Sequence, residues 1–487
     1  MFSNDEFTCE IDALGYRSQA DTLRKLIICC ETPYAVGISG RWGSGKTSMM
    51  KYLMASLGGK PLSHRLQYQS DLISNAVEDK QFEAVLTQLV AEGVSTDSIR
   101  HIVPIWFNPW EHENQDEPFV ELLREIHHFF SSTALLGQVG KVAATIIRAG
   151  LDILGNFLKV GKNPASHIQD LGEQHEYTHF TYTHRSQQFK LLFQTAVKNL
   201  LTGVAGLGGV LDANARLVIF IDDLDRCEEA VIGRLLKDIK QHLSTQHCVF
   251  VFGYDRHHIE KSLCQNTDRS LKESRSYLEK LFQSTVYLKQ PTEQKLTTYI
   301  QHQLNPTHSE IDFVADWETE ALSIFLLGIL DPNPRRIKAF FTSFYLHVKT
   351  NDTFAHEEVI ALDHLKKFAL LTYLKLFYEP VYAALENDVT ILNALIAVFQ
   401  TGNDVTLDSY PQCFVYLEVL GHLSAKNVVL EDEQRHKILQ DAASEQKFLT
   451  EVHEMQGKHK SFRTLKQQFL DCFLDMNDSP ERIRPYL

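Results

Sequence analysis

The chain has 487 residues and a formal net charge of −14, from 48 lysines and arginines against 62 aspartates and glutamates. Its 44% hydrophobic and 23% charged residues are ordinary values for a globular protein, which excludes a wholly disordered chain. The length predicts roughly three domains. The acidic balance argues against broad electrostatic binding of nucleic acid, although a local basic groove would be compatible with it.

The cysteines and the apolar runs indicate the compartment. The eight cysteines form no CxxC pair and no zinc-type spacing with histidine, and several lie in apolar runs, as is typical of buried free thiols in a reducing cytosol. The first residues, MFSNDEFTCEID, are acidic and lack the apolar centre of a signal peptide. No uncharged stretch reaches the roughly 20 apolar residues of a transmembrane helix. We therefore expect a cytoplasmic protein.

The first elements in chain order are a helix, a strand, a glycine-rich turn and a second helix. Residues 18–31 show the periodicity of an amphipathic helix, residues 34–38 form a short apolar strand, and residues 49–57 continue as a helix. Between the last two lies the sequence SGRWGSGKTS, residues 39–48. A strand, a glycine-rich turn and a helix in this order are typical of the start of a nucleotide-binding α/β domain.

Four more strands and a long helical region follow. The strands are predicted at 102–107, 217–221, 248–254 and 285–288, with helices between them. Near-continuous apolar strands that alternate with helices indicate an α/β fold with a mostly parallel sheet covered on both faces. After Pro291 only helical patterns follow, which predicts an all-helical C-terminal region.

We divide the chain into five segments on this basis. They are a nucleotide-binding domain in two parts, 1–133 and 186–290, a helical insertion at 134–185, a helical lid-like subdomain at 291–349, and a C-terminal helical region at 350–487.

The sequence from Gly40 to Thr47 matches GxxxxGK[ST] in full and predicts a phosphate-binding loop of the P-loop NTPase class. Glycines let backbone N–H groups turn toward the phosphates, and the following helix presents its positive end to them. Lys46 is expected to reach the β- and γ-phosphates of ATP, and the Thr47 hydroxyl to bind Mg²⁺. The predicted nucleotide-binding residues are Gly40, Trp42, Gly43, Ser44, Gly45, Lys46, Thr47 and Ser48.

An acidic pair follows the apolar strand at 217–221. A strand that ends in an acid places a carboxylate at the carboxyl edge of the sheet, where ligands bind in open α/β folds. Asp222 is predicted to hold Mg²⁺, and Asp223 to act as the general base that polarises the attacking water. Two alternatives stay open: Asp223 serves only as a helix cap, or Glu111, just past the strand at 102–107, is the base.

Several motifs together resemble the KAP family of P-loop NTPases, within the signal-transduction ATPases. They are GISGRWGSGKTSMMKYL, IWFNPWEHE, LVIFIDDLDRCEEAVIGRLLKDIK, FVFGYDRHHIEKSL, YLEKLFQSTVYL and NPRRIKAFF. The resemblance covers roughly residues 18–345. It implies that ATP binding and hydrolysis act as a conformational switch in multi-component assemblies, including bacterial phage-exclusion and defence systems. Many relatives carry transmembrane helices inside the NTPase domain, and this chain departs from that pattern.

Three arginines are candidates for contact with the nucleotide. Arg226 either pairs with Asp223 or Asp225 and holds the loop, which we favour, or acts across a subunit interface as an arginine finger. Arg335 and Arg336 begin a helix after the sheet, where Asn333 suits the cap and Pro334 the first turn. One of them would close on the γ-phosphate; the alternative is that both face solvent.

Two further patterns have competing interpretations. Residues 135–160 form an amphipathic helix with Leu135, Val139, Val142, Ile146, Ile153 and Phe157 on one face. This face packs either against the protein's own core or another subunit, or against a membrane surface. His175 to His179 matches HExxH, but its β-branched and aromatic flanks weaken the helix that a zinc protease site needs.

The functional hypothesis is an ATPase with ATP and Mg²⁺ as ligands, acting as a switch for protein partners and associating with itself, more so with ATP. The site residues are Lys46, Asp223, Glu111, Arg335, Arg336 and Arg226 for catalysis, and Thr47 and Asp222 for the metal. The alternatives are a scaffold that binds ATP with little turnover, a signalling ATPase at a membrane surface, and a zinc hydrolase.

Overall fold

The structure is a computed structural model. It describes residues 15–59, 76–95, 97, 99–112, 118–131, 141–158, 182–205, 211, 213–267, 270–304, 316–354, 360–377, 379–390, 392–393, 395–396 and 460–487. The chain forms two compact units, the N-terminal unit Phe7–Lys289 and the C-terminal unit that begins at Gln290 and ends at Leu487. The division into five segments stays a prediction.

Five parallel strands in the order β2-β3-β4-β1-β5 form the sheet of the N-terminal unit. They are β1 (Tyr34–Ser39), β2 (Ile102–Phe107), β3 (Arg216–Ile221), β4 (Cys248–Tyr254) and β5 (Ser284–Tyr287). The predicted α/β fold with a parallel sheet is confirmed, and the strand bounds agree to within one residue. The order of the strands places β4 between β1 and β3, so the ends of β1 and β3 lie on either side of the end of β4.

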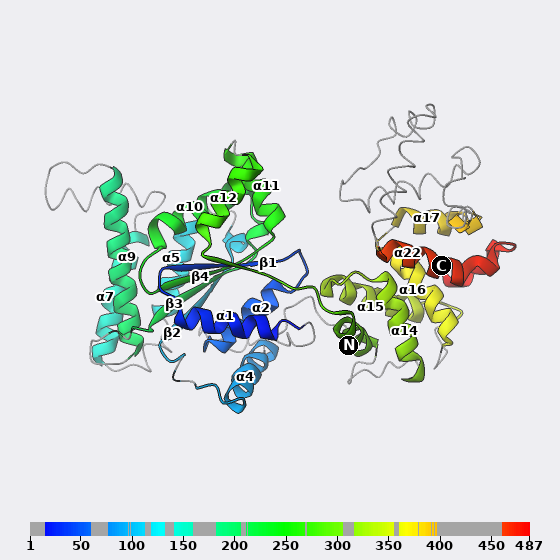
Figure 1. Cartoon of the computed structure of the whole chain (residues 1–487), viewed down its shortest axis with the longest axis horizontal. Helices are drawn as coiled ribbons and strands as arrows, with labels where there is room; N and C mark the ends of the chain where they lie inside the picture. The colour runs from blue at the N-terminus through cyan, green and yellow to red at the C-terminus, as the bar shows by residue number, and fades with distance from the viewer. Residues whose placement is uncertain are drawn as a thin grey trace. The chain divides into compact units, whose positions relative to one another are not determined.

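Helices cover both faces of this sheet (Figure 1). On one face lie α1 (Arg17–Cys29) and α2 (Lys46–Ser56), with α4 (Ala76–Ala91) against α2. On the other lie α5 (Pro118–Ser131), α10 (Glu229–Asp238), α11 (Arg256–Thr267) and α12 (Leu271–Leu281). Every residue of β3 and β4 is buried, as near-continuous apolar strands require. The sequence analysis did not predict α4.

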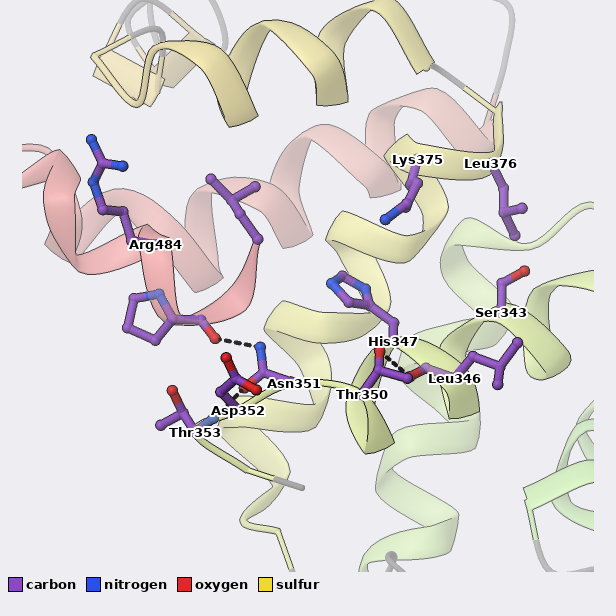
Figure 2. Close-up of a pocket in the computed structure, with 12 residues that line it drawn as sticks. Ser343, Leu346, His347, Thr350, Asn351, Asp352, Thr353, Lys375, Leu376 and Arg484 are labelled. Carbon is purple, nitrogen blue, oxygen red and sulfur yellow. Dashed lines mark hydrogen bonds between the residues drawn. The ribbon is translucent and has the colours of Figure 1, made fainter. Parts of the chain in front are cut away.

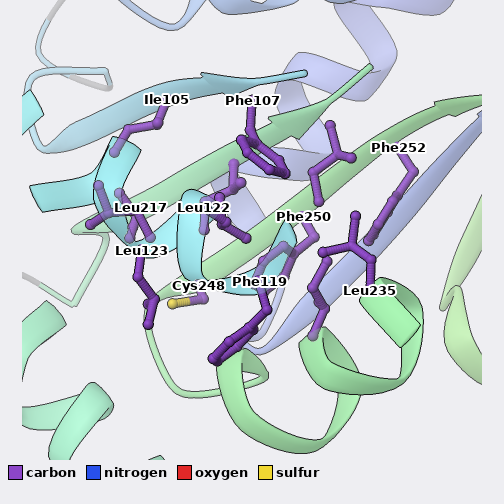
Figure 3. Packing of buried hydrophobic residues seen from close by; sticks show 14 of the residues in the cluster. Ile105, Phe107, Phe119, Leu122, Leu123, Leu217, Leu235, Cys248, Phe250 and Phe252 are labelled. Carbon is purple, nitrogen blue, oxygen red and sulfur yellow. The ribbon is translucent and has the colours of Figure 1, made fainter. Parts of the chain in front are cut away.

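Alternate residues of the strands build the core beneath one face of the sheet (Figure 3). Phe107, Phe250 and Phe252 are each at most 1% exposed, and Phe119 and Leu122 of α5 and Leu235 of α10 pack in the same cluster. Strand residues two positions apart face the same side of the sheet. Each strand therefore presents one group of apolar side chains to the helices on one face and another group to the helices on the other. This core holds the carboxyl ends of the strands in place.

The helical insertion pairs α7 (Lys141–Leu158) with α9 (Tyr182–Ala205) and packs against α5. Ile147, Leu151 and Leu154 of α7 are buried in the same core cluster, whereas the predicted face members Ile146 and Ile153 are only partly buried. Ile153 of the predicted face still packs against this cluster, while Ile147, Leu151 and Leu154 form its buried centre.

The other members of the predicted face lie beyond what the structure shows. Leu135 and Val139 lie outside the described residues, as do the side chains of Val142 and Phe157. For the described part of α7, the partner of the apolar face is the protein's own core. The described part of α7 therefore favours the alternative in which the helix packs against the protein's own core.

The C-terminal unit is helical in all of its described elements. They are α13 (Glu293–Leu304), α14 (Asp316–Ile329), α15 (Pro334–Lys349), α16 (Leu362–Phe377), α17 (Glu379–Asn387) and α22 (Lys460–Phe473), followed by two 3-10 segments, Leu474–Met476 and Pro480–Tyr486. Phe340, Phe344 and Phe368 are fully buried at its centre. Among the described helices of the chain, none combines the length and apolarity that a membrane crossing needs.

Glycine at position 150 allows α7 and α9 to approach closely. A Cβ atom there would lie 3.0 Å from both Ala196 O and Leu200 Cγ of α9. We expect Gly150→Val to lower the free energy of unfolding by about 1 to 3 kcal/mol, because the added atoms overpack a tight contact. The measurement is urea unfolding followed by circular dichroism.

Gly233 of α10 is the matched control. A Cβ atom at Gly233 would have no atom within 4 Å, so Gly233→Ala is expected to raise stability by up to about 1 kcal/mol through helix propensity. An unchanged unfolding midpoint for Gly150→Val would contradict the packing of α7 on α9.

Candidate functional site

A glycine-rich loop joins β1 to α2 at the carboxyl edge of the sheet. Gly43 and Gly45 have φ values of 76° and 94°, which only glycine adopts at little cost. A Cβ atom at Gly40 would lie 2.5 Å from Ser44 Oγ. The backbone path of the loop thus requires glycine at 43 and 45, whereas Gly40 leaves room for the Ser44 side chain, and Lys46 then begins α2.

Three hydrogen bonds hold the loop in place. Gly40 N donates to Tyr254 O of β4 over 3.2 Å, and Ser44 N donates to Arg41 O over 3.1 Å. The buried Tyr16 donates from its hydroxyl to Ser44 O over 2.9 Å. Burial raises the pKa of Tyr16 to about 12, so the phenol stays protonated and keeps its donor. The sequence analysis missed Tyr16, which no local motif marks.

The ammonium of Lys46 lies inside this loop. Its Nζ atom is 3.0 Å from Gly40 O and 3.4 Å from Arg41 O. It also forms an ion pair of 3.2 Å with Oδ2 of Asp225, and the two side chains are only 8% and 7% exposed. The position fits the predicted phosphate contact, since the amine is close to the backbone that would surround a phosphate.

Asp222 comes directly after β3 and is 2% exposed. Burial is the main cause that raises the pKa of Asp222 to about 6; the charge of Asp223 adds to it, and a hydrogen bond with Thr47 opposes it. A Cβ atom at Gly253 of β4 would lie 2.7 Å from Asp222 Oδ1, so glycine there makes room for the carboxylate.

Two polar atoms at this edge are buried and have no hydrogen-bond partner among the described residues, namely Ser44 Oγ and Asp222 Oδ1. Buried polar groups are normally paired, so unpaired atoms next to the loop indicate a place for a ligand. A carboxylate oxygen and the Thr47 hydroxyl are hard oxygen donors of the kind that Mg²⁺ prefers. Thr47 and Asp222 therefore fit the predicted metal.

Asp223 has left-handed backbone angles, φ 54° and ψ 26°, which are uncommon outside glycine. Its Oδ1 atom forms an ion pair with Arg226 Nε at 3.0 Å, and its Oδ2 atom accepts from Asn108 Nδ2 at 3.4 Å. Its side chain makes no capping bond to the 3-10 turn that follows, Leu224–Arg226. The arrangement thus gives the carboxylate a role other than that of a cap to this turn.

Glu111, the alternative base, shares the Asn108 side chain with Asp223. Its Oε1 atom accepts from Asn108 Nδ2 at 2.9 Å, so Asn108 bridges the two acids. Glu111 lies in the 3-10 turn Pro109–His112 that follows β2. Asn108 was not predicted as a site residue, although its position right after a strand was a usable signal.

Arg226 lies in the pairing that the sequence analysis favoured. Besides its ion pair with Asp223, its guanidinium lies 5.3 Å from the centre of the Trp110 ring.

The remaining predicted nucleotide-binding residues lie in or next to the glycine loop. Trp42, within the loop, is 60% exposed. Thr47 and Ser48 lie in the first turn of α2.

Arg335 and Arg336 begin α15 in the C-terminal unit, and the predicted cap is confirmed. Asn333 Oδ1 accepts from Arg335 N at 3.1 Å and from Arg336 N at 3.3 Å, and Pro334 occupies the first turn. The side chain of Arg336 forms an ion pair with Asp331 and lies 4.3 Å from the centre of the Phe377 ring. A role for either arginine toward the γ-phosphate stays a prediction.

A hollow of about 570 Å³ lies in the C-terminal unit (Figure 2). His347, Asn351, Lys375 and Arg484 are among the residues that line it. Burial is the largest of the causes that lower the pKa of His347 to about 4, and its Nδ1 atom is 2.8 Å from Thr372 Oγ1. His347 is thus a neutral packing residue at neutral pH.

The zinc hypothesis falls on residues that the structure does not describe. His175 and His179 both lie outside the described ranges. Within those ranges no group of three or more histidine, cysteine, aspartate or glutamate side chains is arranged to hold a metal ion.

The raised pKa of Asp222 predicts how stability depends on pH. The folded-state pKa, about 6, lies above the ordinary 3.8, so the favourable contribution is complete below about pH 4 and is lost as pH rises through 6. At pH 7.5 the buried charge then costs about 1 to 3 kcal/mol. We expect Asp222→Asn to raise the free energy of unfolding by this amount at pH 7.5, without nucleotide or metal, and to have no effect at pH 4.

Chemical denaturation at the two pH values measures this difference. Glu228→Gln, at an exposed acid in the next turn, is the control and should change stability little at either pH. An equal effect of Asp222→Asn at both pH values would show that the carboxylate carries no burial penalty.

Comparisons with known proteins place the chain in a family. No curated protein sequence matches it. Among solved structures, the Aeropyrum pernix ORC2 protein in its ADPNP and ADP complexes is 11% identical, with a TM-score of 0.38, over 94% of this chain and 98% of that one. The Aeropyrum pernix ORC1 protein in complex with DNA is 12% identical, with a TM-score of 0.32, over 91% and 82%. The family model of the KAP family P-loop domain matches residues 16–351, and the chain therefore belongs to the KAP family of P-loop NTPases.

Proposed function

We propose that this protein binds and hydrolyses Mg·ATP and that the cycle acts as a conformational switch in a multi-component assembly. The observation that carries the proposal is the grouping of Lys46, Thr47 and the unpaired oxygen of Asp222 around the glycine loop. Lys46 and Thr47 begin α2 and Asp222 follows β3, so these groups meet at the carboxyl edge of a parallel sheet. Membership of the KAP family supports nucleotide binding at this loop.

Each part of the nucleotide has residues that suit it. The backbone N–H groups of the loop and the start of α2 would bind the phosphates, and Lys46 would neutralise the β- and γ-phosphates. The Thr47 hydroxyl and Asp222 would hold Mg²⁺. Held by these two residues, Mg²⁺ would help to neutralise the negative charge that develops on the phosphates during transfer.

Hydrolysis requires a base that orients and deprotonates water. Asp223 is our first choice because it follows the metal-binding acid directly and lies at the open end of β3. In this structure Arg226 and Asn108 orient its two oxygens, and each oxygen keeps a second lone pair that could accept a proton from water. Glu111 is the second choice, since Asn108 links it to the same place.

The switch would pass the state of the site to partner proteins. Arg335 or Arg336 would sense the γ-phosphate from the capped start of α15, and a ligand can shift a conformation only through such differential contacts. Self-association with ATP and a place in an anti-phage system remain part of the proposal, supported by the resemblance of the sequence motifs. The buried face of α7 no longer supports self-association.

Replacing the loop lysine tests nucleotide binding. We expect Lys46→Ala to weaken ATP binding by at least about 100-fold, because the triphosphate loses its buried cation. Calorimetric titration with Mg·ATP measures this. The control is Lys51→Ala, one turn further along α2, where the ammonium lies 4.2 Å from the centre of the Trp106 ring. Undiminished ATP affinity in Lys46→Ala would remove the loop from the nucleotide site.

Neutralising each acid in turn identifies the base. We expect Asp223→Asn to keep ATP bound and to slow hydrolysis by about 100-fold or more, the usual scale for losing a general base. Glu111→Gln is the paired variant and should keep most of the activity. The reverse result would make Glu111 the base. Little turnover by the wild type at saturating Mg·ATP would instead favour a scaffold that binds ATP.

A further inference from the structure

The ion pair between Lys46 and Asp225 has no part in the chemistry described so far. Asp225 is the middle residue of the 3-10 turn Leu224–Arg226. Leu224, the residue before it, is fully buried. Its Oδ2 atom is 3.2 Å from Lys46 Nζ, and both side chains are nearly inaccessible to solvent. A carboxylate is therefore already bound to the cation that the β- and γ-phosphates of a nucleotide would need.

We propose that Asp225 is an internal counter-ion that occupies Lys46 in the nucleotide-free protein and must be displaced when a nucleoside di- or triphosphate binds. This inference rests on the proposed nucleotide site and adds a regulatory element to it. The carboxylate already accepts from the ammonium that a phosphate oxygen would also need, so the two anions would compete for one cation.

Electrostatics give the direction of the effect. A buried ammonium without a partner is strongly unfavourable, so Asp225 stabilises the empty loop. A phosphate group at Lys46 would place further negative charge within a few ångströms of the same carboxylate, where the low local dielectric strengthens repulsion. Asp225 therefore opposes nucleotide binding for as long as it stays in place.

Displacement of Asp225 would also affect Asp223, the predicted base. Arg226, the next residue, is bound to Asp223 Oδ1 at 3.0 Å and to the Trp110 ring. The turn consists of three residues and follows Asp223, whose backbone is already in the left-handed region. A movement that frees Asp225 thus changes the position of Arg226, which links occupancy of Lys46 to release of the Asp223 carboxylate.

The test compares the affinity of three nucleotides for the full chain. We expect Asp225→Asn to bind ATP and ADP about tenfold more tightly than the wild type, the change that corresponds to 1.4 kcal/mol. Binding of AMP should change less than twofold, because AMP has no phosphate that reaches Lys46. Isothermal titration calorimetry with Mg²⁺ gives the three dissociation constants.

The control removes a charge from the same segment without touching Lys46. Glu228 is exposed, and Glu228→Gln should leave all three affinities within twofold of the wild type. An equal gain in Glu228→Gln would reduce the effect to overall charge and overturn the proposal. An equal gain for AMP in Asp225→Asn would overturn it too, since that pattern reports a change in the whole pocket.

Unchanged or weaker ATP and ADP binding in Asp225→Asn, with a melting temperature near that of the wild type, would also overturn the proposal. Asp225→Ser is the second variant, used if Asp225→Asn fails to fold, and the same outcomes apply to it. Absence of ATP binding by the wild type would instead be the failure of the proposed function, so the two failures are distinguishable.

Discussion

A lysine ammonium buried within a loop of backbone is the constraint on which the rest of this site depends. Lys46 is 7% exposed, and such a charge is tolerated only where partners surround it. Carbonyl oxygens of Gly40 and Arg41 and the carboxylate of Asp225 supply those partners. The loop can bend around the amine only because glycines take the strained positions. Its curvature is held from outside by Tyr16 and by the end of β4.

The acidic turn after β3 completes a set of charges that balance one another without a ligand. Asp225 is bound to Lys46, and Asp223 is bound to Arg226. The pKa of Asp222 rises to about 6 because it is buried beside another acid, and the nearby charge of Lys46 opposes this only in part. The unbalanced group is the one that a divalent cation would satisfy. The two ion pairs thus fix the acidic turn, and Asp222 is the acid in it that suits a divalent cation.

The insertion between β2 and β3 serves the same core rather than an external surface, as far as its described residues go. α7 and α9 extend the layer that α5 begins, and Gly150 allows their backbones to approach closely. The buried face of α7 consists of Ile147, Leu151 and Leu154. These residues pack in the core cluster that also holds residues of α5 and α9, so this face of α7 is internal to the fold.

Local patterns were enough for the sequence by itself to determine the five strands, the glycine loop, the acidic turn and the cap at Asn333, because each depends on residues close together in the chain. Only the tertiary structure decided the order of the strands, helix α4 and the buried face of α7. The spacing of apolar residues is compatible with more than one buried face, and packing selects one of them. The same holds for the contacts of Lys46 with Asp225, 179 positions away, and of Tyr16 with Ser44. A buried charge takes whichever opposite charge the fold brings near it, and no spacing in the sequence specifies that partner.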